Sequence, residues 1–417
     1  MNNLYLTPIS QTFSHEKIED IPGRVAAAMQ QSAVEFLPGT RIAIAVGSRG
    51  ISHLPLIVRA VVDYLKSRDV QCFIVPAMGS HGGASAEGQR EVLTSLGVTE
   101  ASIGVPIRSS MQVIELPRGS LEFPVYQDQI AHKADGIIVI NRIKAHTDFM
   151  GEIESGLAKM CVIGLGKHKQ ALTMHRFGVK GLRDYIPVAA EQILQTSKIL
   201  LGIGLVENAY DETMRIEAIR PEAILREEKE LLKLSRSCMP SLPVDTLDLL
   251  ILDQMGKDIS GTGMDPNIIG RRMIAGEPDL PRPVISRLIV CGLSEQSHGN
   301  ALGMGMADFI TRRLHDAIDF HATNENTLTS TFIERGRVPI IAETDRLAVE
   351  YAMRTWGSIQ PEDARIIRAE NTLHIDRLYV SNAVLDKIRD RSDITVTGDP
   401  VAQFTEDGWL TPFRGNR

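Results

Sequence analysis

Between residues 41 and 96 the sequence runs twice through one pattern: a short apolar run, a glycine-containing polar loop and a segment with helical periodicity. Arg41 to Val46 (RIAIAV) leads into GSRG, and apolar residues then recur at helical spacing from Leu54 to Leu65. Cys72 to Pro76 (CFIVP) leads into GSHGGAS, where Ser85 can cap a helix from about Ala86 to Leu96. This repetition predicts βαβ units on a parallel sheet with right-handed crossovers.

The polar loops matter because ligands on such sheets bind at the carboxyl ends of the strands. The loops 47–50 and 79–85 both follow a predicted strand. A third apolar run, Gly136 to Ile140, leads into another polar segment. We therefore expect three loops of the first half of the chain to meet at one edge of a sheet.

The chain has 417 residues, which is too long for one ordinary core. The run CMPSLPVDT (238–246) has two prolines and no periodicity, and we interpret it as a linker. We predict two α/β domains with mainly parallel sheets, residues 1–240 and 247–417, and an active-site cleft between them. Further strands are expected at 112–116, 199–205, 247–252, 285–291 and 338–342, and helices at 221–237, 307–318 and 345–355. The many charges of the helix at 221–237 are most simply a solvated face.

The bulk composition excludes several classes of protein. A hydrophobic content of 43% and a charged content of 23% are typical of a globular protein, and the net charge of −7 does not favour nucleic-acid binding. No apolar run approaches the roughly 20 residues of a membrane helix, and no secretory signal is visible. The four cysteines (72, 161, 238 and 291) lack CxxC spacing, and Cys72 and Cys291 are expected in buried strands. We expect a cytoplasmic protein.

The segment from Asn141 to His175, NRIKAHTDFMGEIESGLAKMCVIGLGKHKQALTMH, concentrates more potential chemistry than any other window of its length. It holds three histidines, several lysines and several glycines. Histidine can act as base, acid or metal ligand near neutral pH, and lysine can form a covalent bond to a cofactor. A basic, glycine-rich surface loop is the competing interpretation.

Three residues of the first two loops are candidates. Arg49 can bind a carboxylate bidentately, or it can make a surface salt bridge. Ser48 can contact a phosphate or cap the following helix. His81 is flanked by small residues that leave its ring accessible to a substrate hydroxyl, although a turn histidine without a role would look the same. GSHGGAS lacks the GK[ST] ending of a phosphate loop.

His146, Lys159 and His175 lie thirteen and then sixteen residues apart, so only the fold can bring them together. His168 stands among charged residues and is expected in solvent. Glu152 and Glu154 can form an acid/base pair, but a solvated edge is the simpler interpretation.

The predicted second domain offers fewer candidates. A polar cluster within residues 257–272 can close over an anionic ligand or form an ordinary capped loop; it comprises Lys257, Asp258, Asp265, Asn267, Arg271 and Arg272. His298 has no partner that the sequence identifies. Trp356 is either a pocket wall or a core residue.

The order of these residues resembles the nickel-dependent lactate racemase family, over most of the chain and most strongly over residues 40–180. That family has an arginine after the first strand, a histidine after the second, a second histidine, a lysine from a glycine-rich loop and a further histidine. In this sequence the matching residues are Arg49, His81, His146, Lys159 and His175.

The resemblance implies a nickel-pincer nucleotide cofactor, a pyridinium mononucleotide whose sulfur-bearing arms hold nickel. Lys159 would be tethered to it through a thioamide, and His175 would bind the nickel, which imidazole and sulfur donors suit. His81 and His146 would each serve one enantiomer of a 2-hydroxy acid during hydride transfer to the cofactor. Arg49 would hold the substrate carboxylate. The N-terminal domain is thus expected to be the cofactor-binding and catalytic one, and the C-terminal domain to close the cleft.

Other contacts follow less directly from the resemblance. Ser48 and Lys144 are candidates for contact with the nucleotide phosphate, and Trp356 for the pocket wall. ESGLAKM replaces the family's GG-x-K sequence, and the spacing from His146 to Lys159 is longer. In MDPNIIGRRM, Gly270 stands where the family has a substrate-binding glutamine, and Arg271 or Arg272 lies near the position of its lysine. We therefore expect a larger or more anionic hydroxy acid than lactate.

The leading prediction is a racemase or epimerase of a 2-hydroxy acid, an isomerase that uses a nickel-pincer nucleotide. One alternative is a nickel-independent α/β hydrolase or lyase acting on an anionic small molecule. Another is a non-catalytic carrier or sensor of the cofactor. The first predicts nickel and added mass on Lys159; the second predicts neither; the third predicts cofactor without any change of stereochemistry. A small-molecule substrate is the expected partner, without nucleic acid or membrane.

Overall fold

The structure is a computed structural model that describes residues 3–48 and 50–413. The chain folds into two compact units. Residues 14–239 form the N-terminal unit, and the C-terminal unit combines the chain up to Phe13 with everything from Pro240 onward. Both units are α/β with parallel strands, which confirms the predicted fold class.

The main sheet of the N-terminal unit has the strand order β3-β2-β6-β7-β8. Its strands are β2 (Arg41–Val46), β3 (Gln71–Pro76), β6 (Gly136–Arg142), β7 (Ile199–Glu207) and β8 (Thr213–Ile219). All neighbours are parallel except β8, which runs antiparallel to β7. The carboxyl ends of β2, β3 and β6 therefore share one edge, as the sequence predicts.

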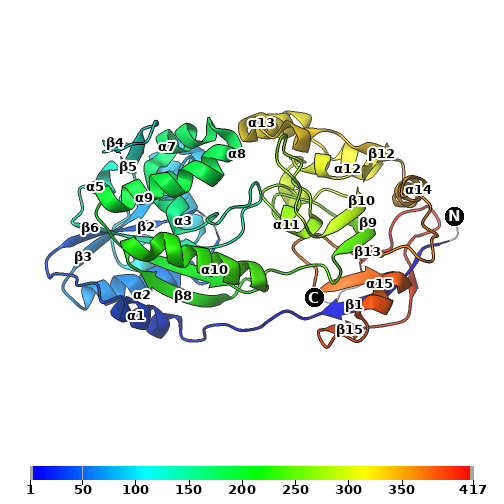
Figure 1. The fold of residues 1–417 in the computed structure, drawn as a ribbon, viewed down its shortest axis with the longest axis horizontal. Coiled ribbons are helices and arrows are strands. Elements are labelled where there is room, and N and C mark those ends of the chain that lie inside the picture. Colours follow the sequence, from blue (N-terminus) through cyan, green and yellow to red (C-terminus); the bar gives the residue numbers. More distant parts are fainter. Residues whose placement is uncertain (1–2, 49, 414–417) are drawn as a thin grey trace. The chain divides into compact units, whose positions relative to one another are not determined.

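Helices cover both faces of this sheet (Figure 1). Helices α1 (Ile21–Gln31) and α2 (Leu54–Lys66) pack on alternate strand residues such as Ile42, Ile44 and Ile138. Helix α10 (Ile224–Cys238) packs on the other face, where β7 carries Gly202 and Gly204. A Cβ at Gly202 would lie 2.7 Å from a methyl of Leu157, so these glycines let a helix approach closely.

Other elements of this unit lie outside the main sheet. The strand expected at 112–116 is β4 (Val113–Leu116), which pairs only with β5 (Val125–Asp128). Helix α3 (Ala86–Ser95) begins at the predicted cap, since the Ser85 hydroxyl accepts from Gly88 N. The other α-helical and π-helical elements are α4 (Glu100–Ile103), α5 (Gln129–His132), α6 (Leu157–Lys159), a π-helical turn (Met160–Gly164), α7 (Leu165–His175), α8 (Gly178–Lys180), a second π-helical turn (Gly181–Tyr185) and α9 (Ile186–Thr196).

The sheet of the C-terminal unit follows the order β12-β11-β10-β9-β13-β14-β1-β15. Its parallel strands are β9 (Thr246–Leu252), β10 (Val284–Val290), β11 (Phe309–Thr311), β12 (Ile340–Ala342) and β13 (Ile366–Ala369). The antiparallel part consists of β14 (Arg377–Val380), β1 (Tyr5–Gln11) and β15 (Ile394–Val396), and β16 (Val401–Ala402) also pairs with β1. Helices of this unit are α11 (Pro266–Ile269), α12 (Arg312–Asp316), α13 (Phe320–Ser330), α14 (Asp345–Thr355) and α15 (Asn382–Ile388).

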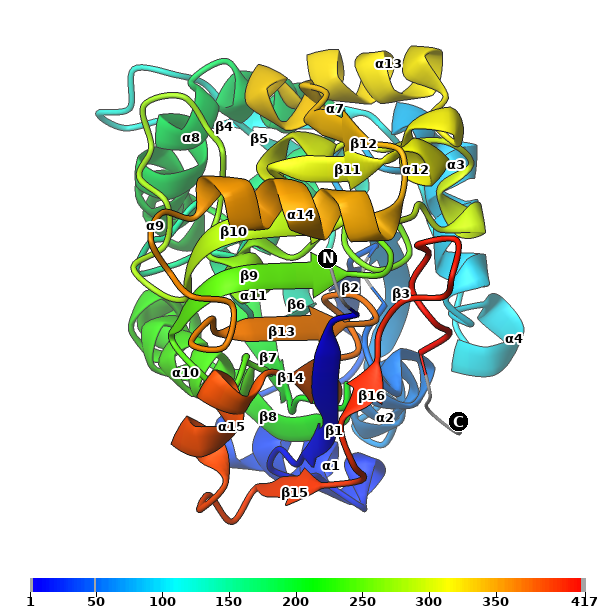
Figure 2. The same cartoon turned by 90° about the vertical axis from the view of Figure 1, so that its right-hand side faces the viewer.

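Two sequence predictions differ from this structure. The N-terminal domain was predicted to begin at residue 1, but β1 lies between β14 and β15 (Figure 2). The helix predicted at 307–318 is instead the strand β11 followed by the short helix α12. The apolar residues Phe309 and Ile310 belong to a buried strand, in which Thr311 is buried as well. In the described part of the chain, no helix is both long and apolar enough to span a membrane. Cys72 and Cys291 are buried, as expected.

Candidate functional site

The loops after β2 and β3 both pack against the helical segment 157–164. A Cβ at Gly47 would lie 2.6 Å from Cε of Met160, and one at Gly79 would lie 2.9 Å from a methyl of Ile163. Gly79 also has φ +60 and donates its N–H to Gly164 O at 3.3 Å. At Gly79 the positive φ and the close contact both favour glycine, whereas at Gly47 the near atom is the flexible end of Met160.

Ser48 and His81 join the first two loops. The hydroxyl of Ser48 lies 2.5 Å from Nδ1 of His81, and the His81 side chain is exposed. Arg49, the residue after Ser48, lies outside the described residues. The structure thus brings together two of the three candidates of these loops.

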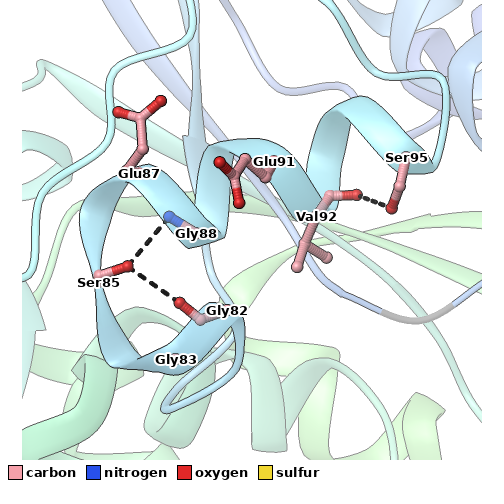
Figure 3. Close-up of a pocket in the computed structure, with 8 residues that line it drawn as sticks. All are labelled: Gly82, Gly83, Ser85, Glu87, Gly88, Glu91, Val92 and Ser95. Atoms are coloured by element: carbon pink, nitrogen blue, oxygen red, sulfur yellow. Dashed lines mark hydrogen bonds between the residues drawn. The ribbon is translucent and has the colours of Figure 1, made fainter.

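A hollow of about 680 Å³ lies beside His81 along α3. Figure 3 shows Ser85 there, accepting from Gly88 N and donating to Gly82 O. The charged residues that line this hollow are the carboxylates Glu87 and Glu91. Two carboxylates repel a phosphate, so this hollow does not suit the anionic end of a nucleotide.

His146 and Lys159, both in the segment 141–175, are in direct contact. Nζ of Lys159 lies 2.6 Å from Nε2 of His146, and the His146 ring stacks on Phe149 at a centroid distance of 4.6 Å. The sequence separation of thirteen residues is closed by the loop after β6, which returns to begin α6. Both side chains are partly exposed.

The hydrogen bonds of His146 orient its ring. The backbone N–H of Asp148 donates to Nδ1 at 3.1 Å, so this side of the ring faces its own loop. Nε2 faces the amine of Lys159 and lies within hydrogen-bond distance of it. The amine of Lys159 and the imidazole of His146 can therefore exchange a proton.

Glu154 holds the loop that carries His146. It accepts from His146 N at 2.6 Å and from Gly151 N at 2.8 Å, and it forms an ion pair with Arg236 at 2.5 Å. Burial raises the pKa of Glu154, while these bonds oppose that shift. Glu152 is exposed and bonds Lys229, which lowers its pKa. The two carboxylates therefore have separate structural roles and do not form an acid/base pair.

His175 ends the helical run that begins at Leu157. The run contains Lys159 and is interrupted by the π-helical turn Met160–Gly164, a feature often found at functional sites. The side chain of His175 reaches solvent, but much of its ring is surrounded by protein. This desolvation and the charge of Lys159 lower the pKa of His175, and the charge of Asp148 opposes the shift. A lowered pKa favours the neutral imidazole, which is the metal-binding form. His168 is exposed, as expected.

Glu228 was expected on a solvated helix face, but it is completely buried. Its Oε2 accepts from Ala158 N at 2.8 Å, so it caps the helical run one residue before Lys159. Burial raises its pKa to about 7, and its Oε1 has no hydrogen-bond partner among the described residues. The signal in the sequence was the four-residue spacing of Ile224, Glu228 and Leu232, which share the buried face of α10.

The other predicted site residues lie elsewhere. Lys144 pairs through its backbone with Ser155, and its side chain is exposed. Arg271 donates to Met306 O and Ile285 O and pairs with Asp308 at 2.8 Å. Arg272 is buried, and Trp356 packs in the core of the C-terminal unit with Nε1 donating to Ile359 O.

A metal bound by protein groups alone would need several ligands close together. Among the residues that the structure describes, no group of three or more His, Cys, Asp or Glu side chains is arranged to hold a metal ion. His175 lies close enough to Lys159 for the charge of that lysine to lower its pKa, and Lys159 in turn contacts His146.

Comparisons with known proteins show a likeness of fold. No protein-family model matches the chain, and no curated protein matches it in sequence. Among solved structures, the lactate racemase apoprotein from Thermoanaerobacterium thermosaccharolyticum is similar, with a TM-score of 0.50 and 12% sequence identity. The match covers 86% of this chain and 92% of that chain. The chain therefore has a lactate-racemase-like fold.

Proposed function

We propose that this protein is a racemase or epimerase of a 2-hydroxy acid that works with a nickel-pincer nucleotide attached to Lys159. The observation that carries this proposal is the 2.6 Å contact between Lys159 and His146 on a lactate-racemase-like fold. It places an amine that can form a covalent bond beside a group that can move protons, at the edge of a parallel sheet where ligands bind.

The residues of this site fit the cofactor by their chemistry. Lys159 supplies an amine for a covalent bond, and His175 supplies a neutral imidazole, a donor that suits nickel. In this proposal the sulfur-bearing arms of the cofactor supply the other donors. When bound, the cofactor supplies a centre that takes up a hydride and returns it.

The chain's own groups then move the proton of the substrate hydroxyl. The C–H bond of a 2-hydroxy acid is not acidic, so hydride removal needs a base that accepts the hydroxyl proton at the same time. His146 and His81 are the two proposed bases, one for each enantiomer. The contact between the Ser48 hydroxyl and Nδ1 of His81 orients the imidazole ring.

Substrate selection is assigned to arginine side chains. Arg49 is proposed to hold the carboxylate by resemblance. Arg271 and Arg272 are proposed to select a larger or more anionic acid than lactate, but the guanidinium of Arg271 is occupied by partners in its own unit. Kinetics of Arg272→Ala on every accepted substrate test this point, and unchanged values would remove it.

Deuterium at C2 tests the proposed reaction. Single enantiomers of 2-hydroxy acids carrying C2 deuterium are incubated with cofactor-loaded protein in ordinary water. Hydride transfer predicts racemisation with deuterium retained in both enantiomers, because the same nucleus returns to C2. Racemisation with loss of deuterium to water would show proton abstraction instead, and hydrolysis or elimination products would favour the alternative enzyme classes.

A further inference from the structure

Lys167 has a backbone conformation that is normally restricted to glycine. Its φ is 57° and its ψ is −159°, and its side chain is completely buried. A non-glycine residue persists in this region only where surrounding contacts hold it there, and such residues cluster at functional sites. Lys167 lies on the helical run between Lys159 and His175.

The ammonium group of Lys167 contacts three separate elements. It donates to Pro76 O at the end of β3 and to Oε1 of Gln89 on α3 at 3.0 Å. It also lies 3.2 Å from Oδ2 of Asp128 at the end of β5. Two of the three donors of the ammonium are thus used in hydrogen bonds, and the contact with Asp128 is an ion pair.

Gln89 links Lys167 through hydrogen bonds to the loop that carries His81. The side chain of Gln89 is completely buried, and its Nε2 donates to Gly79 O at 2.9 Å and to His81 O at 3.3 Å. Because an ammonium can only donate, it requires the amide oxygen of Gln89 to face Lys167. The amide nitrogen must then face the loop carbonyls.

We propose that Lys167 and Gln89 are positioning residues for His81. They hold the loop 79–81 in a fixed position relative to the helical run that carries Lys159 and His175. The imidazole of His81 therefore keeps a constant position relative to the side chains of that run. The proposal rests on the proposed function only in giving His81 an acid/base role; the positioning itself is a property of the protein without cofactor.

Helix α7, which carries Lys167, also offers a matched control for Gln89. Gln170 is as completely buried as Gln89, accepts from Tyr126 N at 2.7 Å and donates to Pro124 O at 3.4 Å. These bonds hold β5 and its preceding loop and do not involve residues 79–81. A general loss of packing should therefore affect both glutamines alike, whereas positioning of His81 concerns Gln89 alone.

The test is Gln89→Glu compared with Gln170→Glu in protein without cofactor. Gln89→Glu keeps the side-chain volume and the acceptor for Lys167 but places an oxygen against Gly79 O and His81 O. We expect amide hydrogen exchange at residues 79–85 to quicken by about tenfold or more, because two hydrogen bonds are lost. We also expect the His81 ring signals in NMR to shift toward those of an exposed histidine. Gln170→Glu should lower the thermal midpoint and leave both readouts unchanged.

Lys167→Met is the second variant, since it keeps a long side chain and removes the donors. If Gln89→Glu does not fold, Lys167→Met must produce the same change at His81. Unchanged His81 signals and exchange in the folded variants, with lower thermal midpoints, would overturn the proposal and leave the network a purely structural one. If His81 responds but the loaded protein racemises no substrate, the positioning stands and the proposed function fails.

Discussion

Both main sheets have an edge formed by the carboxyl ends of parallel strands, where ligands can bind. The two edges carry different kinds of side chains. In the N-terminal unit, the loops at the carboxyl ends of the strands carry donor–acceptor pairs, Ser48 with His81 and His146 with Lys159. In the C-terminal unit, the corresponding edge carries ion pairs. Asp253, directly after β9, receives two bonds from Arg368 on β13 at 2.7 and 2.6 Å.

A hollow of about 560 Å³ lies at this second edge. It is lined in part by Asp253, Arg313, Arg368 and Glu370. The bidentate bond to Asp253 occupies the buried guanidinium of Arg368, and Arg313 pairs with Asp345 at 3.3 Å. The two edges therefore differ in the groups that they carry: the first holds histidines in contact with a serine and a lysine, and the second holds charges in ion pairs.

Replacing Lys159 should give the largest effect. Lys159→Ala removes the proposed tether and the partner of His146, and we expect a loss of activity on the order of 10³-fold or more. Lys169→Ala is the control, because Lys169 is an exposed lysine of the same helical run whose amine lies over the Tyr126 ring. Equal activities of Lys159→Ala and Lys169→Ala would show that Lys159 has no special role in the reaction, and the proposed function of the first edge would fail.

Breaking the ion pair of the second edge should affect stability instead of turnover. Arg368 is 1% exposed, and Arg368→Leu removes both of its bonds to Asp253, leaving a partly buried carboxylate without this ion pair. We expect a loss of about 3–5 kcal/mol in the free energy of unfolding, measured in urea. The double variant with Asp253→Asn should recover part of it. A loss of activity at unchanged stability would mean that this edge also holds a functional site.

Glu228 predicts a dependence of stability on pH. Its pKa is raised from 4.5 to about 7, so the folded protein keeps a proton that the unfolded chain releases. Stability should therefore fall as the pH rises from 4.5 to about 7 and then level off, by ~3 kcal/mol in total. Glu228→Gln stays uncharged and should gain that amount relative to the parent protein across this window. Urea unfolding from pH 5 to 8 measures it, and parallel curves would contradict the assignment.

Ser48→Ala should have the smallest effect. It removes one hydrogen bond to Nδ1 of His81, worth about 1 kcal/mol, so we expect turnover to fall by about fivefold. Turnover of Ser48→Ala and of Lys159→Ala, measured on the same substrate, would show which of the two segments contributes more to the reaction. A fall as large as that of Lys159→Ala would assign Ser48 a direct role in the reaction.

The parts of the fold that the sequence predicted are those set by local pattern. Runs such as RIAIAV and CFIVP are short, apolar and bounded by glycine, and both are strands. The position of β1 was not predictable in this way, because its partners lie more than 360 residues away, as in the pair Thr7 and Val380. The segment 307–318 misled because a three-residue strand and a five-residue helix together imitate one periodic helix.

The candidate site divides in the same manner. Residue type and loop context identified His81, His146 and Lys159 as candidates, and the fold brings the last two into contact. Lys167 and Glu228 were missed because lysine and glutamate among other charges read as surface residues. Their burial depends on elements distant in the sequence, such as β5 for Lys167 and α6 for Glu228.

The central claim is tested most directly by the mass and metal content of the protein purified from its native host. Intact mass spectrometry, peptide mapping and metal analysis would be made on one sample, since a host lacking the cofactor pathway would yield empty protein. We predict an added mass on the peptide containing Lys159, together with bound nickel, and loss of both in Lys159→Ala. An unmodified Lys159 in protein that is active without nickel would contradict the account.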